Sequence, residues 1–198
     1  MMISTKANLA FLAMPRAAST SIEEALLPFA DIAFKGFPRF KHLNLAMYNL
    51  RLRPFLKANN FESLETVALF REPVAWLQSW YQYRADPKIK LKRNSSAGVS
   101  FNEFVEAYLM DDGPDFAKVG QQSRFVASKT ETCGVDILFK FENLSGFADF
   151  MSEKFLTEFA FGHANASNKK AAYLSPELER ALKDKFSIDY DIYETFAK

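Results

Sequence analysis

Cysteine, histidine and long apolar runs are scarce in this sequence, and each scarcity excludes a class of protein. The 198 residues include one cysteine, Cys133, which excludes an internal disulfide framework and a zinc site built on several thiolates. The apolar run at residues 9–14 is far shorter than the roughly 20 apolar residues of a transmembrane helix. The N-terminal region also lacks the basic stretch and the small-residue cleavage site of a signal peptide. We therefore expect a soluble, cytoplasmic protein.

An excess of charge of one sign is also missing. The sequence has 25 Lys and Arg against 24 Asp and Glu, and proteins that bind nucleic acid or membrane surfaces in general carry a visible basic excess. We therefore expect neither nucleic acid nor membrane as a partner, and no acidic cluster predicts a metal site. The 48% of hydrophobic residues, including 21 Phe, exclude disorder and predict a single domain over residues 1–198.

Two strand–turn–helix units organise the chain. The first has a buried strand at residues 9–14, a turn at Pro15 and a helix that begins with hydroxyl caps at Ser19. The second has a strand at residues 65–71 and a helix that begins at Pro73, where a missing N–H group costs nothing. This order predicts the α/β class, as a three-layer, P-loop-like fold with a central, mainly parallel sheet flanked by helices.

The rest of the chain predicts further elements of both kinds. Strands are expected at residues 32–34 and 135–141. Helices are expected at residues 42–59, with an interruption near Pro54, and at residues 101–110, 116–127, 144–155 and 176–186, the last with Ser175 as its N-cap. Residues 162–170 read as a polar loop.

The first candidate site is the segment Pro15-Arg16-Ala17-Ala18-Ser19-Thr20-Ser21. A buried strand that ends in small residues lets backbone N–H groups converge at the next helix start, which favours an anion. The three hydroxyls and the guanidinium add side-chain donors. The pattern G-x-x-x-x-G-K-[ST] is absent, which disfavours an ATP or GTP enzyme of that type. An ordinary capped helix after a strand explains the same residues, and that alternative stays open here.

The second candidate site is Arg71-Glu72-Pro73, followed after five residues by Ser79-Trp80-Tyr81. An arginine at the carboxyl end of a strand can hold a dianionic phosphate through a two-pronged contact. Ser79 projects from the following helix about 9 Å along its axis from Pro73, within reach of the same group. In isolation these residues fit a surface ion pair and a helical serine equally well. The two motifs in this order, each at a strand-to-helix junction, favour one phosphate site.

These segments resemble the donor-binding motifs of sulfotransferases that use 3′-phosphoadenosine 5′-phosphosulfate (PAPS). Residues 15–21 are similar to the Pro-Lys-Thr-Ala-Ser-Thr-Ser loop of the uronyl and heparan sulfate 2-O-sulfotransferases, with Arg16 replacing lysine and Ala17 replacing threonine. Residues 71–81 match the family's 3′-phosphate signature, R-x-P-x5-S-x-Y. The resemblance implies that the donor, and its product 3′-phosphoadenosine 5′-phosphate (PAP), contact Arg16, Ala17, Ala18, Ser19, Thr20, Ser21, Arg71 and Ser79.

The resemblance also extends to a later loop and to the catalytic groups. Residues 162–170 are similar to a loop that folds over the donor, in which Ser167 is the nearest match to a contacting hydroxyl. The 2-O-sulfotransferases place a catalytic histidine between the two motifs, which implies that His42 is the base, with His163 in reserve. Arg16 is implied as the catalytic cation at the leaving oxygen. A helix-start histidine without a titration role is the alternative for His42.

The basic stretch at residues 84–93 indicates an anionic acceptor, such as a uronate-containing glycan, although a solvated loop fits it too. Arg124 either faces the acceptor or forms an interhelical ion pair. The aromatic residues are mostly expected in the core, and three of them are candidates for stacking on adenine or sugar: Trp76, Trp80 and Tyr81. We expect an enzyme that transfers the sulfuryl group of PAPS to a hydroxyl of a carbohydrate acceptor. The alternatives are a catalytically inactive module that binds PAP or PAPS, and a P-loop-type phosphotransferase.

Overall fold

The strands of the protein form one mixed sheet. The computed structural model describes residues 1–61, 64–88, 93–161 and 172–198, and the strand order is β3-β1-β2-β4-β5. β2 (Leu9–Leu12), β4 (Glu65–Phe70) and β5 (Ile137–Lys140) are parallel neighbours. β1 (Met2–Ser4) is antiparallel to both β2 and β3 (Ile32–Ala33). The prediction of an α/β fold with a mainly parallel central sheet is confirmed.

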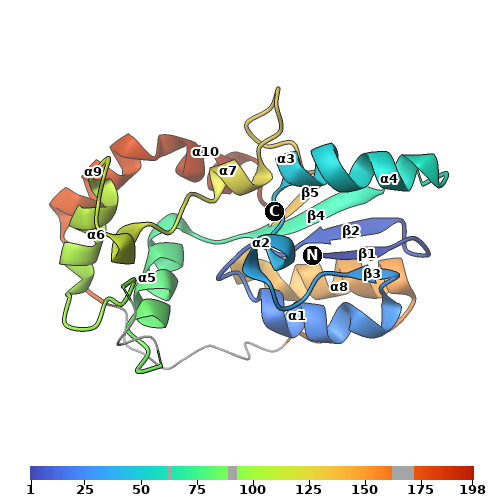
Figure 1. The fold of residues 1–198 in the computed structure, drawn as a ribbon, viewed down its shortest axis with the longest axis horizontal. Helices are drawn as coiled ribbons and strands as arrows, with labels where there is room; N and C mark the ends of the chain where they lie inside the picture. Colours follow the sequence, from blue (N-terminus) through green and yellow to red (C-terminus); the bar gives the residue numbers. More distant parts are fainter. Residues whose placement is uncertain (62–63, 89–92, 162–171) are drawn as a thin grey trace.

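Helices cover both faces of this sheet (Figure 1). α1 (Ser19–Leu26) and α8 (Leu144–Phe155) lie on one face. The continuous helical segment made of α3 (Leu45–Met47), a π-helical turn η2 (Tyr48–Leu52) and α4 (Arg53–Ala58) lies on the other. A second group packs around its own hydrophobic cluster beyond the carboxyl end of β4: α5 (Pro73–Arg84), α6 (Phe101–Leu109) and α9 (Pro176–Lys185).

Short elements and a last helix complete the described chain. They are η1 (Leu27–Phe29), α2 (Pro38–Lys41), η3 (Asp115–Ala117), α7 (Ser123–Val126), η4 (Phe141–Asn143) and α10 (Ser187–Thr195). None of the helices in the described ranges is both long enough and apolar enough to cross a membrane.

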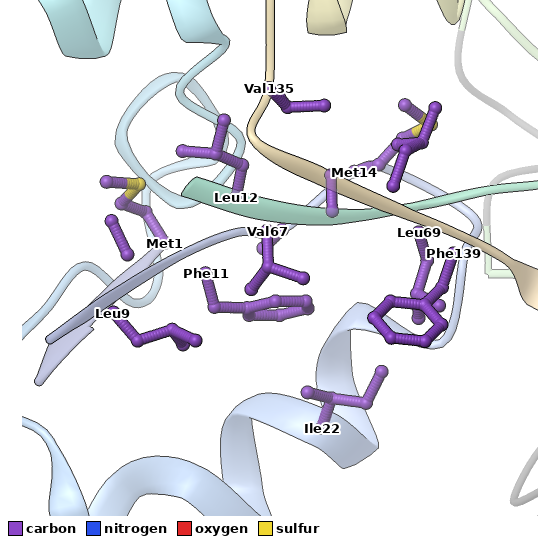
Figure 2. Packing of buried hydrophobic residues seen from close by; sticks show 14 of the residues in the cluster. Met1, Leu9, Phe11, Leu12, Met14, Ile22, Val67, Leu69, Val135 and Phe139 are labelled. Atoms are coloured by element: carbon purple, nitrogen blue, oxygen red, sulfur yellow. The ribbon is translucent and has the colours of Figure 1, made fainter. Parts of the chain in front are cut away.

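Apolar side chains on alternate positions of the parallel strands build the main core. Phe11 of β2 lies in register with Val67 of β4. All residues of β2 are buried, and so are those of β4 after its first residue. Figure 2 shows Phe11, Leu69 and Phe139 on the side of the sheet that faces Ile22 of α1, and Leu12 on the opposite side. Burial of both faces explains why these strands are continuous apolar runs in the sequence.

The predicted helix at residues 116–127 is wrong. The structure has the short turn η3 and the short helix α7 there, separated by non-helical chain. Gly120 lies between them with φ +83°, a left-handed conformation that ends a right-handed helix. The apolar side chains of this segment are therefore buried on two separate short elements, η3 and α7, and not along one helix.

The predicted helix at residues 42–59 differs in its start and in its irregular part. It begins at Leu45, where the side chain of Asn44 accepts a hydrogen bond from the N–H of Met47 (2.9 Å). Pro54 does not interrupt it but lies in the first turn of α4, directly after the π-helical turn. A proline ring clashes with the carbonyl one turn before it, and the wider turn falls at that place.

Replacing Phe147 of α8 with alanine should lower the free energy of unfolding by about 3–5 kcal/mol, because the buried ring leaves a cavity. The ring lies 5.9 Å from that of Phe11 and 5.4 Å from that of Phe139, measured between centroids. Urea denaturation measures the loss. Phe196→Ala, at a side chain 51% exposed, is the control and should cost about 1 kcal/mol or less. Equal losses would contradict the packing described.

Candidate phosphate-binding site

The two sequence motifs meet at the carboxyl edge of the sheet, because β2 and β4 are adjacent and parallel. Arg16, in the loop after β2, donates a hydrogen bond from Nε to Oγ of Ser79 in α5 (3.1 Å). Arg71, directly after β4, donates from Nη1 to the backbone carbonyl of Arg16 (3.4 Å). The structure therefore places Arg16, Arg71 and Ser79 in one site, although 63 positions separate Arg16 from Ser79.

The loop between β2 and α1 has an unusual backbone. Arg16 (φ 66°) and Ala18 (φ 52°) are both left-handed, and neither is a glycine. Such a conformation costs about 1–3 kcal/mol per residue and persists only where the surroundings enforce it. Alternation of left-handed and right-handed residues turns successive N–H groups toward one point, which makes a concave site for an anion.

Three donors enforce that conformation by holding carbonyl groups of the loop. The indole Nε1 of Trp76 donates to the carbonyl of Pro15 (3.0 Å). Arg71 donates to the carbonyl of Arg16, and the hydroxyl of Ser21 donates to the carbonyl of Ala18 (3.1 Å). Trp76 and Arg71 come from the second motif, so the second motif fixes the shape of the first.

The N-terminus of α1 is open, which corrects the expectation of hydroxyl caps. Its N-cap residue is Ala18, and no side chain in the described part of the chain caps the helix. The hydroxyl of Ser21 is used by a carbonyl, and Thr20 Oγ1 accepts from Nζ of Lys41 (3.1 Å). Since the first turn of a helix leaves N–H groups without intrahelical partners, this end of α1 is suited to an anion.

The N-terminus of α5, in contrast, is closed by its own sequence. Both carboxylate oxygens of Glu72 accept backbone hydrogen bonds, from Val74 (3.0 Å) and from Ala75 (2.6 Å). Glu72 therefore acts as an N-cap next to Arg71 and supports the helix that carries Ser79.

The two arginines of the site are half-buried cations, and no described carboxylate lies within ion-pair distance of either. Burial lowers the pKa of Arg16, and the neighbouring charge of Arg71 lowers it further, against an opposite effect of Tyr83. Burial likewise lowers the pKa of Arg71, although Glu142 and Glu72 act in the other direction. Neither arginine forms an ion pair within the described ranges.

Aromatic rings and carbonyls take the place of a carboxylate around these cations. The guanidinium of Arg16 lies 4.7 Å from the ring centroid of Tyr83, and that of Arg71 lies 4.4 Å from the ring centroid of Phe141. Nε of Arg71 is buried and has no hydrogen-bond partner among the described residues. Two desolvated positive charges at an open helix start form a site complementary to a multiply charged anion.

Gln122 holds the backbone of Arg71, a role that the sequence alone did not reveal. Its side-chain oxygen accepts from the N–H of Arg71 (3.0 Å), and its Nε2 donates to the carbonyl of the same residue (2.8 Å). The side chain of Gln122 is 1% exposed, so both bonds are shielded from water. Next to it, the N–H of Ser123 donates to the buried carboxylate of Asp189 (2.9 Å), which fixes the segment that carries Gln122.

His42 lies beside the end of β2. Its Nδ1 is 2.7 Å from the carbonyl oxygen of Ala13. A carbonyl can only accept, so Nδ1 carries the proton, and Nε2 of the neutral ring keeps its lone pair. Burial lowers the pKa of His42 from its usual value of 6.5, with Lys41 acting in the same direction. The ring is thus a neutral base close to the loop at residues 14–18.

Lys41 also reaches the start of α1, and it has a carboxylate partner. Its Nζ lies 3.2 Å from a carboxylate oxygen of Glu23, whose side chain is 2% exposed. The other oxygen of Glu23 pairs with the amino group of Met1 (2.7 Å). One carboxylate is therefore shared by two cations here, whereas Arg16 and Arg71 have no ion-pair partner in the described part of the chain.

Other residues singled out from the sequence have different surroundings. Arg84 is buried and donates to the carbonyls of Asp115 (2.6 Å), Phe116 (2.6 Å) and Lys118 (3.0 Å), which makes it a structural anchor. Arg93 pairs with Asp115, and Arg124 is exposed on α7 and forms no ion pair in the described part of the chain.

The predicted stacking residues also differ from one another, and two candidates have no described surroundings. The hydroxyl of Tyr81 donates to the carbonyl of Val99 (2.9 Å), while Trp76 holds the loop as described above. Trp80 packs against Trp76 and Tyr83. His163 and Ser167, along with residues 89–92 of the basic stretch, lie outside the described residues.

Comparison of the chain with models of known protein families, with curated proteins and with solved structures finds no match. Among the described residues, no group of three or more His, Cys, Asp and Glu side chains could hold a metal ion. Arg16, Arg71, Ser79 and the open end of α1 therefore define the candidate site.

The unpaired state of Arg71 makes a prediction about stability. In phosphate-free buffer, Arg71→Met should leave the free energy of unfolding within about 1 kcal/mol of the wild type, because removal of a half-buried charge offsets the loss of the hydrogen bond to the carbonyl of Arg16. Arg84→Met should lower it by about 3 kcal/mol or more, since three carbonyls lose a charged donor. Urea denaturation compares them. If Arg71→Met costs as much as Arg84→Met, Arg71 has a structural role instead.

Proposed function

We propose that this site binds PAPS and that the protein transfers the sulfuryl group of PAPS to a hydroxyl of an acceptor. The observation that carries the proposal is the pair of half-buried arginines without carboxylate partners at the open start of α1. Two separated anionic groups on one donor match two cations contributed by two different loops. The P-loop-like character of the fold, suggested by the strand–loop–helix unit at residues 9–26, is part of this proposal.

Each end of the donor is assigned to one motif. Arg71 and Ser79 bind the 3′-phosphate, because a guanidinium and a hydroxyl at one point suit a dianion. The loop at residues 15–21 binds the 5′-phosphosulfate through its backbone N–H groups and Arg16. The hydrogen bond between Arg16 and Ser79 couples the two halves, so that occupancy of one changes the surroundings of the other.

The reaction is an in-line displacement at sulfur. The acceptor oxygen forms the new S–O bond while the bond between sulfur and the bridging oxygen of PAPS breaks. The negative charge that develops on the leaving 5′-phosphate is stabilised by Arg16 and by the N–H groups of the loop. PAP leaves with that charge, and the acceptor proton passes to a base.

His42 is the proposed base. Its Nε2 lone pair accepts the hydroxyl proton, while Nδ1 keeps its hydrogen bond to Ala13 and fixes the ring. The imidazolium that forms is stabilised by the same carbonyl. His42 follows Lys41, whose Nζ donates to Thr20 at the start of α1, so the proposed base belongs to a segment that contacts the donor loop.

A carbohydrate is proposed as the acceptor, on the sequence resemblance alone. A module that binds PAP without catalysis is the second candidate, and it is favoured by Arg16, which replaces the usual lysine and is engaged by Ser79. The two candidates share the binding prediction below and differ in the turnover prediction after it.

PAP should bind at least about 100-fold more tightly than AMP, because only PAP offers a 3′-phosphate to Arg71 and Ser79. Isothermal titration calorimetry measures both affinities. In Arg71→Ala the ratio should fall close to one. Arg124→Ala removes an exposed arginine of α7 and should leave the ratio unchanged. Equal affinity of the wild type for PAP and AMP would rule out the assignment of the second motif.

His42→Gln should lower kcat for sulfuryl transfer by about 10²–10⁴-fold, with little change in PAP affinity, because only the base is lost. Since burial lowers the pKa of His42, the neutral base persists as the pH falls through 6.5. The acid limb of kcat/KM should therefore lie below pH 6.5 and should be absent in the variant. Transfer of labelled sulfate from PAPS gives both profiles. Unchanged turnover in His42→Gln would move the base elsewhere, whereas tight PAP binding without any transfer would favour the binding module.

A further inference from the structure

Residues 32–61 have a charge composition unlike that of the whole chain. No Asp or Glu occurs between Asp31 and Glu62, while six of the 25 Lys and Arg residues fall there. These cations are Lys35, Arg39, Lys41, Arg51, Arg53 and Lys57. The nearly neutral overall charge, which argued against a membrane-surface partner, therefore conceals one strongly basic segment.

The same segment concentrates apolar side chains that point into solvent. Six large exposed hydrophobic residues fall within it: Phe37, Phe40, Met47, Leu50, Phe55 and Phe61. Leu50 (55% exposed) and Phe55 (57%) are as exposed as many polar residues. Grouping of this kind in a soluble domain marks an interaction surface.

Four of these residues belong to two helical elements that follow each other in the chain, and Phe37 is the N-cap of the first. On α2, Phe40 contacts Phe37 and Phe34, with ring centroids 5.6 Å and 6.0 Å apart. On the α3–η2–α4 segment, the face toward the sheet buries Leu45, Tyr48 and Leu56. Figure 1 shows α4 at the margin of the molecule, with the sheet on one side only.

The outward face of the α3–η2–α4 segment combines apolar and cationic side chains. It carries Met47, Leu50 and Phe55 together with Arg51 and Lys57, all exposed. We call these five residues the outer face. A helix that is apolar on both sides usually packs against a partner on each side. No described part of the chain covers the outer face, because its side chains are exposed.

We infer that the outer face docks on a membrane surface that contains anionic lipid. Phe and Leu side chains enter the boundary between headgroups and acyl chains, while Arg and Lys pair with the headgroups. A second copy of this chain is disfavoured, because a two-fold contact would place a basic segment without carboxylates against itself. A nucleic acid would satisfy the charge but offers no site for Met47 and Leu50. The inference does not depend on the proposed sulfuryl transfer.

Co-sedimentation with vesicles tests this inference. The protein should sediment with vesicles of phosphatidylcholine and phosphatidylserine, bind less at high salt, and bind weakly to phosphatidylcholine alone. The double variant Leu50→Ser/Phe55→Ser should lose affinity by about tenfold or more. Arg51→Gln/Lys57→Gln should lose about fivefold for each cation, and both variants alter exposed side chains only.

Matched substitutions outside the segment serve as controls. Leu156→Ser removes a leucine that is 90% exposed, and Lys129→Gln removes an exposed lysine; both should bind vesicles like the wild type. Binding to serine-containing vesicles no stronger than to neutral ones would overturn the inference. So would full binding by Leu50→Ser/Phe55→Ser, or affinity for a single-stranded oligonucleotide above that for the vesicles. PAP titration of each variant separates these outcomes from a failure of the donor site.

Discussion

The fold holds two positive charges together in a half-buried site, and neither forms an ion pair with a described residue. Arg16 and Arg71 come from loops at the ends of adjacent parallel strands, so the sheet itself sets their proximity. Desolvation and mutual repulsion both disfavour this arrangement, as the lowered pKa of Arg16 reflects. A buried charge without a partner is costly, and an anionic ligand removes that cost. The proposed anionic ligand would complete the electrostatics of the site.

Neutral groups keep the charges in place in the absence of that ligand. The side chain of Gln122 binds both the backbone N–H and the backbone carbonyl of Arg71, and Trp76 holds the loop that carries Arg16. Trp76 belongs to the hydrophobic cluster of α5, α6 and α9, while the loop at residues 13–17 packs on the core of the sheet. The site therefore lies where the two cores meet, and the packing of each core stabilises one half of it.

The left-handed residues of the loop are a strained part of the site, and the packing of the surrounding cores offsets the cost of that strain. Ala18 and Arg16 adopt a backbone conformation that glycine would adopt at lower cost. The three donors to the loop carbonyls maintain it, and the result is a helix start that no side chain caps. We interpret this strain as the means by which the N–H groups of the loop are turned toward a ligand.

The sequence predicted the two strand–loop–helix units because each joins a continuous buried strand to a clear turn signal. It also predicted which residues would meet, since carboxyl ends of neighbouring parallel strands share an edge. It missed Gln122, because a single glutamine 51 positions from Arg71 carries no local pattern. The hydroxyl caps expected at Ser19 failed for a related reason. The left-handed turn at Ala18 redirects the chain, and no local propensity of an alanine predicts it.

We propose that Arg16 and Arg71 are ligand-binding cations. NMR of the arginine side chains tests this role most directly. The Nε–H signals of Arg16, Arg71 and Arg84 can be assigned with single Arg→Lys variants and followed during titration with PAP. We expect the signals of Arg16 and Arg71 to shift and that of Arg84, which is buried against carbonyls, to stay in place. At saturating PAP, unchanged signals of Arg16 and Arg71 would contradict the account.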